Sequence, residues 1–375
     1  MADKKRTGIW AGILVAGLSA SVASAADHSD ILDKIRLPKG FAISVYAEVP
    51  LARSLALCGS KPVLYVSTRD DRVYAVTNGN GDGVADKVEV LATGMHVPNG
   101  IDCRDGQLLI ALQNRVIAAP LTPEGDLAAP LSEAKTVFTD LPNSRHHGWR
   151  YARFGPDGRY YVGVGAPCNI CETKGNEGTI LSMNADGSDA KHVATGIRNT
   201  VGFDWNPVTG HLFFTDNGAD RMGDNIPPDE LNEVTEPGGF YGFPYVGGKG
   251  IPLTGYQGRR PPQKPIPTVI DFAAHSANLG IRFLKATAFP ADYRNDAIVA
   301  QHGSWNRSVP IGYRLMRVTF NDKGKATGRE VFADGWLRPN GGVLGRPVDV
   351  LEMPDGALLV SDDHAGLIYR ITHGG

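Results

Sequence analysis

Little net charge and few long apolar runs mark this 375-residue sequence. Its 38 Lys and Arg residues nearly balance 40 Asp and Glu residues, for a formal net charge of −2. A strongly basic surface for nucleic acid therefore has no support in the composition. One apolar run lies near the N-terminus and no second long run follows it, so no stable membrane insertion is expected of the remaining chain.

The N-terminal run has the three parts of an export signal. Lys4, Lys5 and Arg6 precede an apolar stretch over 8–22, and a small-residue site ends at Ala25. A membrane anchor is the alternative, but the run contains Gly and Ser and is short for a span. We predict a signal peptide at 1–25, cleavage after Ala25, and a periplasmic or secreted domain at 26–375.

Only four cysteines are present, and an even number in an exported chain favours disulfides. Cys58 and Cys103 fall near the ends of equivalent strands in consecutive repeats, where a bridge between units is expected. Cys168 and Cys171 would then form a local bridge. Glu172 follows this second pair where covalent haem attachment needs His.

Helices are missing between six segments that share one pattern of apolar strand, tight turn and apolar strand. Spacings of 46 to 80 residues and the high content of Gly (46) and Pro (25) suit propeller blades with insertions. The pattern predicts an all-β, six-bladed β-propeller, with 41–48 and 367–372 pairing to close one blade. Two Pro/Gly-rich insertions, 218–244 and 247–276, are expected to cover one face. The six segments are SLALCGSKPVLYVST from Ser54, GIDCRDGQLLIAL from Gly100, GWRYARFGPDGRYYVGVG from Gly148, TVGFDWNPVTGHLFFTD from Thr200, GIRFLKATAFPADYRNDAIVA from Gly280 and PVDVLEMPDGALLVSDD from Pro347.

A propeller brings the residue that opens each inner strand to a common axis. These positions supply cations and amides but no carboxylate, which favours a polyanionic small molecule bound by guanidinium groups. A metal-centred hydrolase would instead need inward Asp and Glu. Loops containing Asn217, His302 and Asp362–Asp363 should line the same mouth. The ring comprises Arg53, Asn99, His147, Asn199 with the preceding Arg198, the His275/Asn278 turn, and Arg346.

Four ordered motifs resemble the soluble quinoprotein sugar dehydrogenases, the glucose/sorbosone dehydrogenase family. The loop GAPCNIC from Gly165 is more similar to the sorbosone and aldose dehydrogenase branch. The motifs are HGWRYARFGPDG from His147, GIRN from Gly196 with Gly202 and Trp205, NGA from Asn217 with DELN from Asp229 and GGFYGFP from Gly238, and GRPVDV from Gly345.

This resemblance implies pyrroloquinoline quinone (PQQ) held on the axis by Ca²⁺. By matching motifs, His147 is the base and Arg198 and Asn199 contact the quinone oxygens. The family also implies the metal positions and the other cofactor contacts. For the metals, it implies Gly218 and Ala219 at the catalytic Ca²⁺ and Glu230 and Tyr241 at a second, structural Ca²⁺. For the cofactor, it implies Arg346 at a carboxylate, with Arg307 in place of a family lysine. We add Asn99, a member of the ring, as a further cofactor contact.

Two departures bear on the substrate. Val348 stands where glucose-oxidising members have a second arginine, and Ala166 stands where they have an acidic residue. Glucose is therefore less favoured than another sugar, aldose or sugar-derived aldehyde. An external electron acceptor, a cytochrome or a quinone, is expected as partner. The alternatives are a calcium-dependent lactonase-type hydrolase and a non-catalytic binding propeller.

A separate calcium candidate begins at Asn78 and ends at Glu89. Its residues match the ligand spacing of an EF-hand loop, except that Asn78 replaces the usual first Asp. A Gly-rich hairpin between outer strands is the alternative interpretation.

Overall fold

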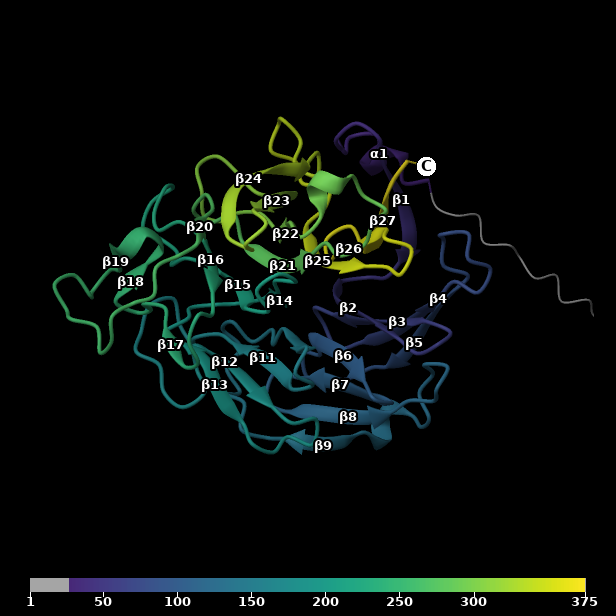
Figure 1. Ribbon diagram of the computed structural model, residues 1–375, viewed down its shortest axis with the longest axis horizontal. Helices are drawn as coiled ribbons and strands as arrows, with labels where there is room; N and C mark the ends of the chain where they lie inside the picture. The colour runs from purple at the N-terminus through teal and green to yellow at the C-terminus, as the bar shows by residue number, and fades with distance from the viewer. Residues whose placement is uncertain (1–26, 375) are drawn as a thin grey trace, which may run out of the picture.

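The computed structural model describes residues 27–374, and the predicted signal peptide lies outside the described residues. Six antiparallel sheets stand around a common centre like the blades of a propeller (Figure 1). The first strands of neighbouring sheets contact one another around this centre. The six-bladed β-propeller predicted from the repeats is thus confirmed.

In blades one to five the innermost strand comes first in sequence, and in blade six the order from the axis is β25, β26, β27 and β1. Blades one to three contain β2 (Ala52–Cys58), β3 (Val63–Thr68), β4 (Val73–Thr77) and β5 (Lys87–Ala92); β6 (Gly100–Arg104), β7 (Gln107–Ala111), β8 (Val116–Pro120) and β9 (Lys135–Phe138); and β10 (Ala152–Phe154), β11 (Tyr160–Val164), β12 (Thr179–Met183), β13 (Lys191–Thr195) and β17 (Gly239–Phe240). Blades four to six contain β14 (Phe203–Trp205), β15 (Leu212–Asp216), β16 (Glu230–Glu233) and β20 (Ile270–Asp271); β21 (Asn278–Phe283), β22 (Ala297–Gln301), β23 (Arg314–Phe320) and β24 (Ala326–Ala333); and β25 (Pro347–Glu352), β26 (Leu358–Asp362), β27 (Leu367–His373) and β1 (Phe41–Glu48).

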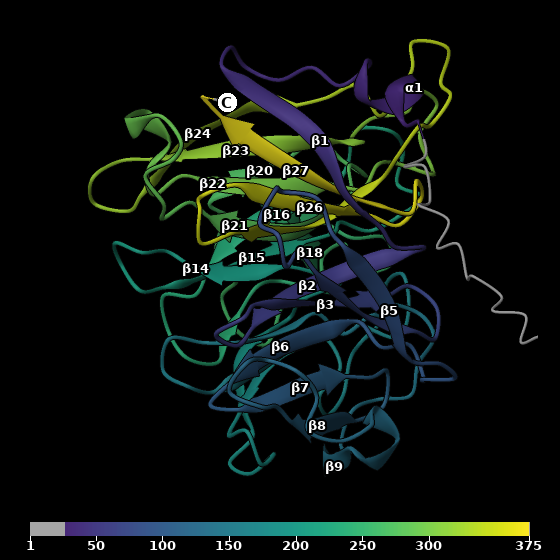
Figure 2. The ribbon, with the colours of Figure 1, turned by 90° about the vertical axis from the view of Figure 1, so that its right-hand side faces the viewer.

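The two ends of the described chain meet in blade six. Strand β1 pairs antiparallel with β27, in a register that sets Phe41 opposite His373 and Glu48 opposite Leu367, and the two strands lie side by side in Figure 2. This pairing covers the edge that β27 would otherwise expose. The predicted closure by the N- and C-terminal strands is confirmed.

The two predicted insertions contribute strands to the blades. The first supplies β16 to blade four and β17, which pairs in parallel with β13 of blade three. The second supplies β20 to blade four. Strands β18 (Val246–Gly247) and β19 (Ile251–Pro252), which lie at the start of the second insertion, pair with each other in a separate small ribbon. Helical structure in the described residues is short. It comprises α1 (Ser29–Leu32), η1 (Leu131–Glu133), η2 (Gly248–Gly250) and η3 (Ala291–Tyr293).

Buried aspartates on alternate inner strands join neighbouring blades. Each carboxylate accepts a hydrogen bond from a backbone N–H of the next blade's inner strand, which satisfies a donor that would otherwise be buried without a partner. The pairs are Asp102 with Phe154 at 2.9 Å, Asp204 with Phe283 at 2.9 Å, and Asp349 with Leu55 at 3.1 Å. These aspartates stand one or two residues inside their strands, so they are not among the strand-opening positions for which no carboxylate was predicted.

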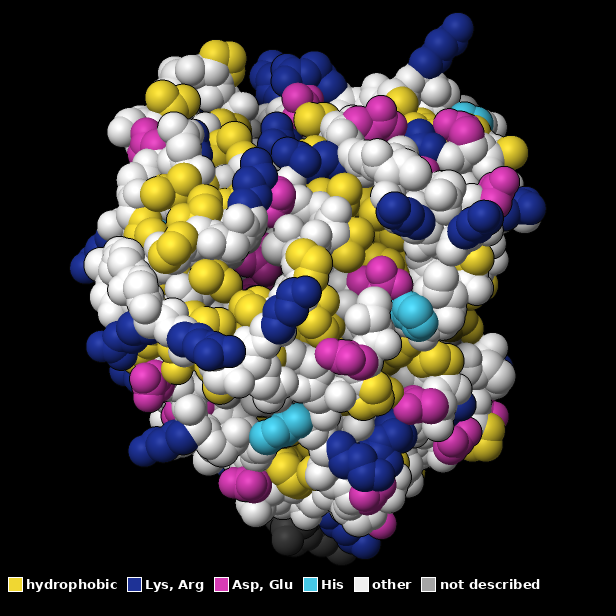
Figure 3. All heavy atoms as spheres, turned by 60° about the vertical axis from the view of Figure 1, so that its left-hand side comes forward, with side chains coloured by type: hydrophobic (Ala, Val, Ile, Leu, Met, Phe, Trp, Pro, Cys, Tyr) yellow, Lys and Arg dark blue, Asp and Glu magenta, His cyan; other side chains and the backbone are white. Residues whose placement is uncertain are grey.

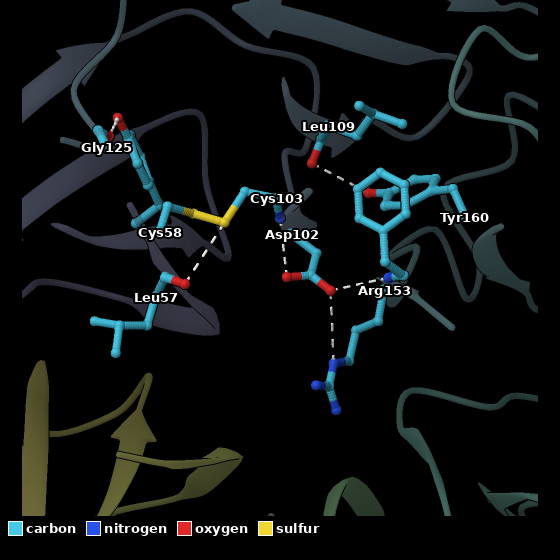
Figure 4. The surroundings of a disulfide bond; sticks show 10 residues. Leu57, Cys58, Asp102, Cys103, Leu109, Gly125, Arg153 and Tyr160 are labelled. Atoms are coloured by element: carbon cyan, nitrogen blue, oxygen red, sulfur yellow. Dashed lines mark hydrogen bonds and ion pairs between the residues drawn. A yellow bond between two sulfur atoms is a disulfide. The ribbon is translucent and has the colours of Figure 1, made fainter. Parts of the chain in front are cut away.

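Both predicted disulfides are present. Cys58 of β2 bonds to Cys103 of β6 and links the first two blades, close to Asp102 and Arg153 (Figure 4). Cys168 bonds to Cys171 within the loop that joins β11 to β12. No free cysteine remains among the described residues.

Apolar side chains fill the spaces between successive blades. Trp336, Phe332 and Tyr369, for example, are buried between blades five and six. On the face shown in Figure 3, Lys and Arg side chains are interspersed with Asp and Glu. Within residues 27–374, none of the helices is long and apolar enough to cross a membrane.

Candidate active site on the propeller axis

A cavity of about 210 Å³ opens at one end of the axis. Loops from several blades line it, and it combines cationic, aromatic and amide side chains. Its lining residues include Arg53, Arg69, His147, Trp149, Arg198, Asn199, Asn217, Gly218, Asp220, Asp229, His275, His302, Trp305 and Asn306.

His147 lies in the loop before β10, with a left-handed backbone (φ 51°). It was expected to open the inner strand, but β10 begins five residues later, because Arg150 binds the carbonyls of Gln113, Pro142 and His147 and holds the loop apart from the sheet. The cavity is nevertheless where the propeller pattern predicted His147 to be.

The ring of His147 is set up to accept a proton. Its Nδ1 donates a hydrogen bond to the carbonyl oxygen of Ala166 at 2.8 Å, so in the neutral ring Nε2 carries the free lone pair. Burial, followed by the positive charge of Arg198, lowers the pKa of His147 well below 6.5. The imidazole is therefore neutral at neutral pH, with Nε2 free to accept a proton.

Arg198 is 4% exposed, and every nitrogen of its guanidinium donates a hydrogen bond. Nε reaches the carbonyl of Asn169 at 2.9 Å and Nη2 reaches its side-chain oxygen at 2.7 Å. Nη1 binds the carbonyl of Asn217 at 3.1 Å, and Nη2 also pairs with Asp220 at 2.7 Å. The guanidinium is fixed in the wall of the cavity.

The loop that carries Arg198 and Asn199 is fastened by Asp216, at the end of β15. The two carboxylate oxygens accept the backbone N–H groups of Arg198 at 2.9 Å and Asn199 at 2.6 Å. Burial raises the pKa of Asp216 to about 6. Burial and the charge of Asp216 raise the pKa of neighbouring Glu230 well above its usual value.

The opposite wall is organised by Asp363, whose side chain is fully buried. It accepts from Arg53 at 3.1 Å and from His302 at 2.7 Å, and Arg69 lies 3.6 Å away. Burial alone would raise the pKa of Asp363, but His302 and the two arginines hold it well below its usual range. The indole of Trp149 lies beneath both Arg53 and Arg69.

The structure gathers only part of the predicted ring at the cavity surface. His147, Arg198, Asn199 and Gly218 line it, together with Arg53 and His275. Asn99 lies behind Arg53, whose Nε donates to its side-chain oxygen at 3.0 Å. Arg346 also lies behind the surface, above the ring of Tyr313 and 3.4 Å from the Nδ1 of His302.

Arg307 is held by loop carbonyls instead of facing the cavity. Its Nη1 donates to the carbonyls of Asp224 and Ala274, and its Nε donates to that of Val309. The four predicted calcium residues, Gly218, Ala219, Glu230 and Tyr241, lie together around a second, very small cavity beside Arg198. The Tyr241 hydroxyl is already used, because it donates to the carbonyl of Glu233 at 2.8 Å.

The predicted EF-hand-like segment is a hairpin loop between β4 and β5. The side-chain amide of Asn80 donates to Asp82 at 3.2 Å and to Asp86 at 2.9 Å, and Glu89 pairs with Lys87. Across residues 27–374, no three His, Cys, Asp or Glu side chains are grouped as a metal site would require. Calcium binding by this loop therefore stays a prediction.

Sequence reasoning missed three residues at the site: Arg69, Asn169 and Asp220. Two carboxylates of the lining, Asp220 and Asp229, were also not among the predicted residues, which included only Asp362–Asp363 as carboxylates of the mouth. All of these residues come from loops rather than from the starts of inner strands. The only available indication was their proximity in sequence to the motifs, with Asp220 just after Asn217-Gly218-Ala219 and Asn169 inside the Cys168–Cys171 loop.

Several buried polar atoms in the walls of the cavity have no hydrogen-bond partner among the described residues. The Oδ1 atoms of Asn217 and Asn306 and the Nδ1 of His275 are buried without a hydrogen bond to any described residue. Buried polar groups are normally paired. Trp305, 65% exposed, adds a flat apolar surface at the mouth. The three buried atoms are all acceptors, since Nε2 of His275 donates to the carbonyl of Gly223, and they suit hydrogen-bond donors of a ligand or a cation. The arginines of the lining suit anionic groups. The site thus suits a planar ligand with anionic groups, bound together with donors or a cation.

Six-bladed propellers with known chemistry share this architecture. The PQQ domain of pyranose dehydrogenase from Coprinopsis cinerea, in its holo form, matches with a TM-score of 0.75 and 18% identity, over 90% of this chain and 97% of that one. A calcium structure of a Trichoderma reesei protein of Carbohydrate-Active Enzymes Family AA12 matches with a TM-score of 0.76 and 18% identity, over the same shares. The soluble aldose sugar dehydrogenase of Escherichia coli, in apo form, matches with a TM-score of 0.64 and 16% identity, over 89% and 99%. These likenesses establish a common fold.

Sequence comparison carries the relationship further. Residues 261–374 match the family described as TrAA12-like. Over 368 residues the chain is 32% identical to an uncharacterized protein of Borreliella burgdorferi, covering 95% of both proteins. The chain belongs to the same family as that protein.

Proposed function

We propose that this protein is a PQQ- and calcium-dependent oxidoreductase that oxidises a sugar, aldose or sugar-derived aldehyde. The observation that carries the proposal is the neutral His147 beside the fixed cation of Arg198, in a cavity rich in arginine. The shared fold of the Coprinopsis cinerea and Escherichia coli dehydrogenases and the TrAA12-like match support it.

The lining of the cavity fits the proposed cofactor. PQQ is flat and carries three carboxylates, so its ring suits the exposed indole of Trp305 and its carboxylates suit guanidinium groups. Arg53, Arg69 and Arg198 are the arginines that line the cavity. Asn99 and Arg346 would act from behind it, by holding Arg53 and His302. Arg307, tied to loop carbonyls, is the weakest of the proposed contacts.

When bound, PQQ supplies an electrophilic quinone that accepts hydride. The chain's own task is to hold the substrate hydroxyl and take its proton. Nε2 of His147 can accept that proton because Nδ1 is committed to the carbonyl of Ala166. The cation of Arg198 favours negative charge that develops beside it. His147 and Arg198 are therefore the proposed catalytic residues.

We assign the proposed catalytic Ca²⁺ to Gly218 and Ala219 and the second, structural Ca²⁺ to Glu230 and Tyr241, which lie around the same small cavity. Ca²⁺ takes carboxylate and backbone carbonyl oxygens. The support is electrostatic, because Asp216 and Glu230 are buried opposite each other on β15 and β16. A divalent cation would relieve their repulsion.

Export to the periplasm, with removal of residues 1–25, completes the proposal. Two disulfides with no free cysteine among residues 27–374 support an oxidising compartment. There an external cytochrome or quinone would reoxidise the cofactor. Sequencing the mature N-terminus should give Ala26 as the first residue.

The function is tested by reconstitution. Purified protein is incubated with PQQ and Ca²⁺, with PQQ and EDTA, or with neither, and a panel of aldoses and sugar-derived aldehydes is supplied with a reducible dye. Quinone absorbance and dye reduction are expected only with PQQ and Ca²⁺ together. The same preparations are assayed for lactone hydrolysis; hydrolysis without dye reduction would replace the proposal with the lactonase alternative.

A further inference from the structure

In the loop closed by the Cys168–Cys171 bridge, Asn169 contacts two residues that line the cavity, Arg198 and Asp220. Its backbone carbonyl accepts from Arg198 Nε at 2.9 Å and its side-chain oxygen accepts from Nη2 at 2.7 Å. The same side chain accepts the backbone N–H of Asp220 at 2.8 Å and donates to the carbonyl of Asp220 at 3.0 Å. One asparagine thus joins blade three to both the arginine and the carboxylate that pairs with it.

The loop has no regular structure between the end of β11 at Val164 and the start of β12 at Thr179. Hydrogen bonds hold its two ends, from His147 to the carbonyl of Ala166 and from Asn176 to Asp140. Around Asn169 it is held by the bridge on either side of that residue and by a small apolar cluster in which Cys168 and Ile170 contact Ala219 and other side chains. A cross-link across a short loop removes alternative conformations of that loop.

We propose that Asn169 is a positioning residue for Arg198 and that the Cys168–Cys171 bridge holds Asn169 in place. Asn169 supplies two of the four acceptors that the Arg198 guanidinium contacts, and both hydrogen bonds are lost if the loop moves. Asp220 would remain, but its own backbone is held by Asn169. The disulfide therefore acts on the cavity without touching it. The inference rests on the proposed function only where it concerns cofactor chemistry.

The direct test follows the Nε–H group of Arg198 by nuclear magnetic resonance in the apo-protein, assigned by its absence in R198K. In wild-type protein this proton should exchange slowly with solvent. In N169A and in C168S/C171S it should exchange at least about tenfold faster, because charge-assisted hydrogen bonds are lost or loosened. In N169D, which keeps the acceptor oxygen, exchange should stay slow.

Two control variants separate positioning from general loss of structure. C58S/C103S removes the other bridge, and N176A removes the bonds of Asn176 to Asp140 in the same loop region. Both should leave Arg198 exchange unchanged. Equal exchange in wild type, N169A and C168S/C171S would overturn the proposal, as would equal acceleration in the C58S/C103S control.

A second arm measures the reconstituted enzyme. N169A and C168S/C171S should reduce cofactor about tenfold more slowly, while N176A should be unaffected. The two arms fail separately. If neither the wild-type protein nor any variant binds PQQ, but exchange of the Arg198 Nε–H proton changes as stated, the proposed function is contradicted and the positioning role of Asn169 is supported. If PQQ chemistry is normal and exchange does not respond, the positioning role falls alone.

Discussion

Nδ1 of His147 donates to the carbonyl oxygen of Ala166 across 2.8 Å, and this single bond decides which nitrogen can act as a base. A carbonyl can only accept, so the proton stays on Nδ1 and the lone pair stays on Nε2. His147 has a left-handed backbone conformation in its loop, and this hydrogen bond gives its ring one defined tautomer in the cavity, with the proton on Nδ1.

The first prediction concerns His147 itself. H147N in reconstituted enzyme should slow cofactor reduction by about 10²–10⁴-fold, the usual contribution of a general base, while PQQ binding persists. H146N, which changes the adjacent histidine, is the matched control and should cost far less. Stopped-flow measurement of quinone reduction decides the matter, and a near-wild-type rate for H147N would remove the assignment.

The pH dependence of the reaction has a defined sign. Because burial and Arg198 lower the pKa of His147 well below 6.5, the neutral, active ring persists below that pH. The rate of cofactor reduction should therefore stay level as pH falls to 6.5 and decline only at lower pH. A decline centred at or above pH 6.5 would contradict this electrostatic account.

The second prediction concerns the space beside His147. A Cβ added at Gly165 would lie 2.4 Å from the Cβ of His147 and 3.0 Å from the side-chain oxygen of Asn199. We expect G165A to lower the free energy of unfolding by about 1–3 kcal/mol through overpacking and to shift the ring resonances of His147. G79A is the control, since its Cβ would meet only one atom, at 3.5 Å. Unchanged His147 resonances in G165A would show that the loop yields freely.

The third prediction concerns Asp363. D363N leaves the buried cation of Arg53 and the ring of His302 without their charged partner, so the free energy of unfolding should fall by about 3–5 kcal/mol. D105N removes an exposed pair with Arg104 and should cost less than about 1 kcal/mol. Urea unfolding of both variants provides the comparison. An equally small decrease in the free energy of unfolding in both variants would mean that Asp363 does not stabilise Arg53 and His302 in the cavity wall.

Much of the fold was predictable because strand alternation and turn residues are local signals. The range 41–48 expected for one closing strand coincides with β1, and the range 367–372 expected for the other lies within β27. The third strand of blade four, β16, was not predicted, because it lies inside an insertion whose high Pro and Gly content indicates a loop. A short strand that gains its pairing partners only in the folded protein leaves little local pattern.

The site was predictable to the extent that it lies at strand starts or in recognisable motifs. His147, Arg198 and Asn199 reach the cavity as expected. Arg69, Asn169 and Asp220 could not be placed, because each comes from a loop whose path depends on long-range contacts such as the bonds between Asn169 and Asp220. The family resemblance did not indicate Asn169, since the proposed role of this residue follows from its contacts with Arg198 and Asp220 in the folded protein.

The last prediction concerns calcium and Glu230. Glu230 and Asp216 are buried together, and their raised pKa values reflect the cost of holding both charges away from water. Ca²⁺ that binds the folded state alone should raise the melting temperature, with a stabilisation of about 2.7 kcal/mol at a concentration 100 times the dissociation constant. E230Q removes one charge, so the calcium-free protein should be at least as stable as wild type, while the calcium-induced rise should be lost. E233Q, on the same strand but paired with His211, should keep the full rise. Melting curves with Ca²⁺, with Mg²⁺ and with EDTA test this. A calcium-induced rise of equal size in E230Q and wild type would move the metal away from this carboxylate.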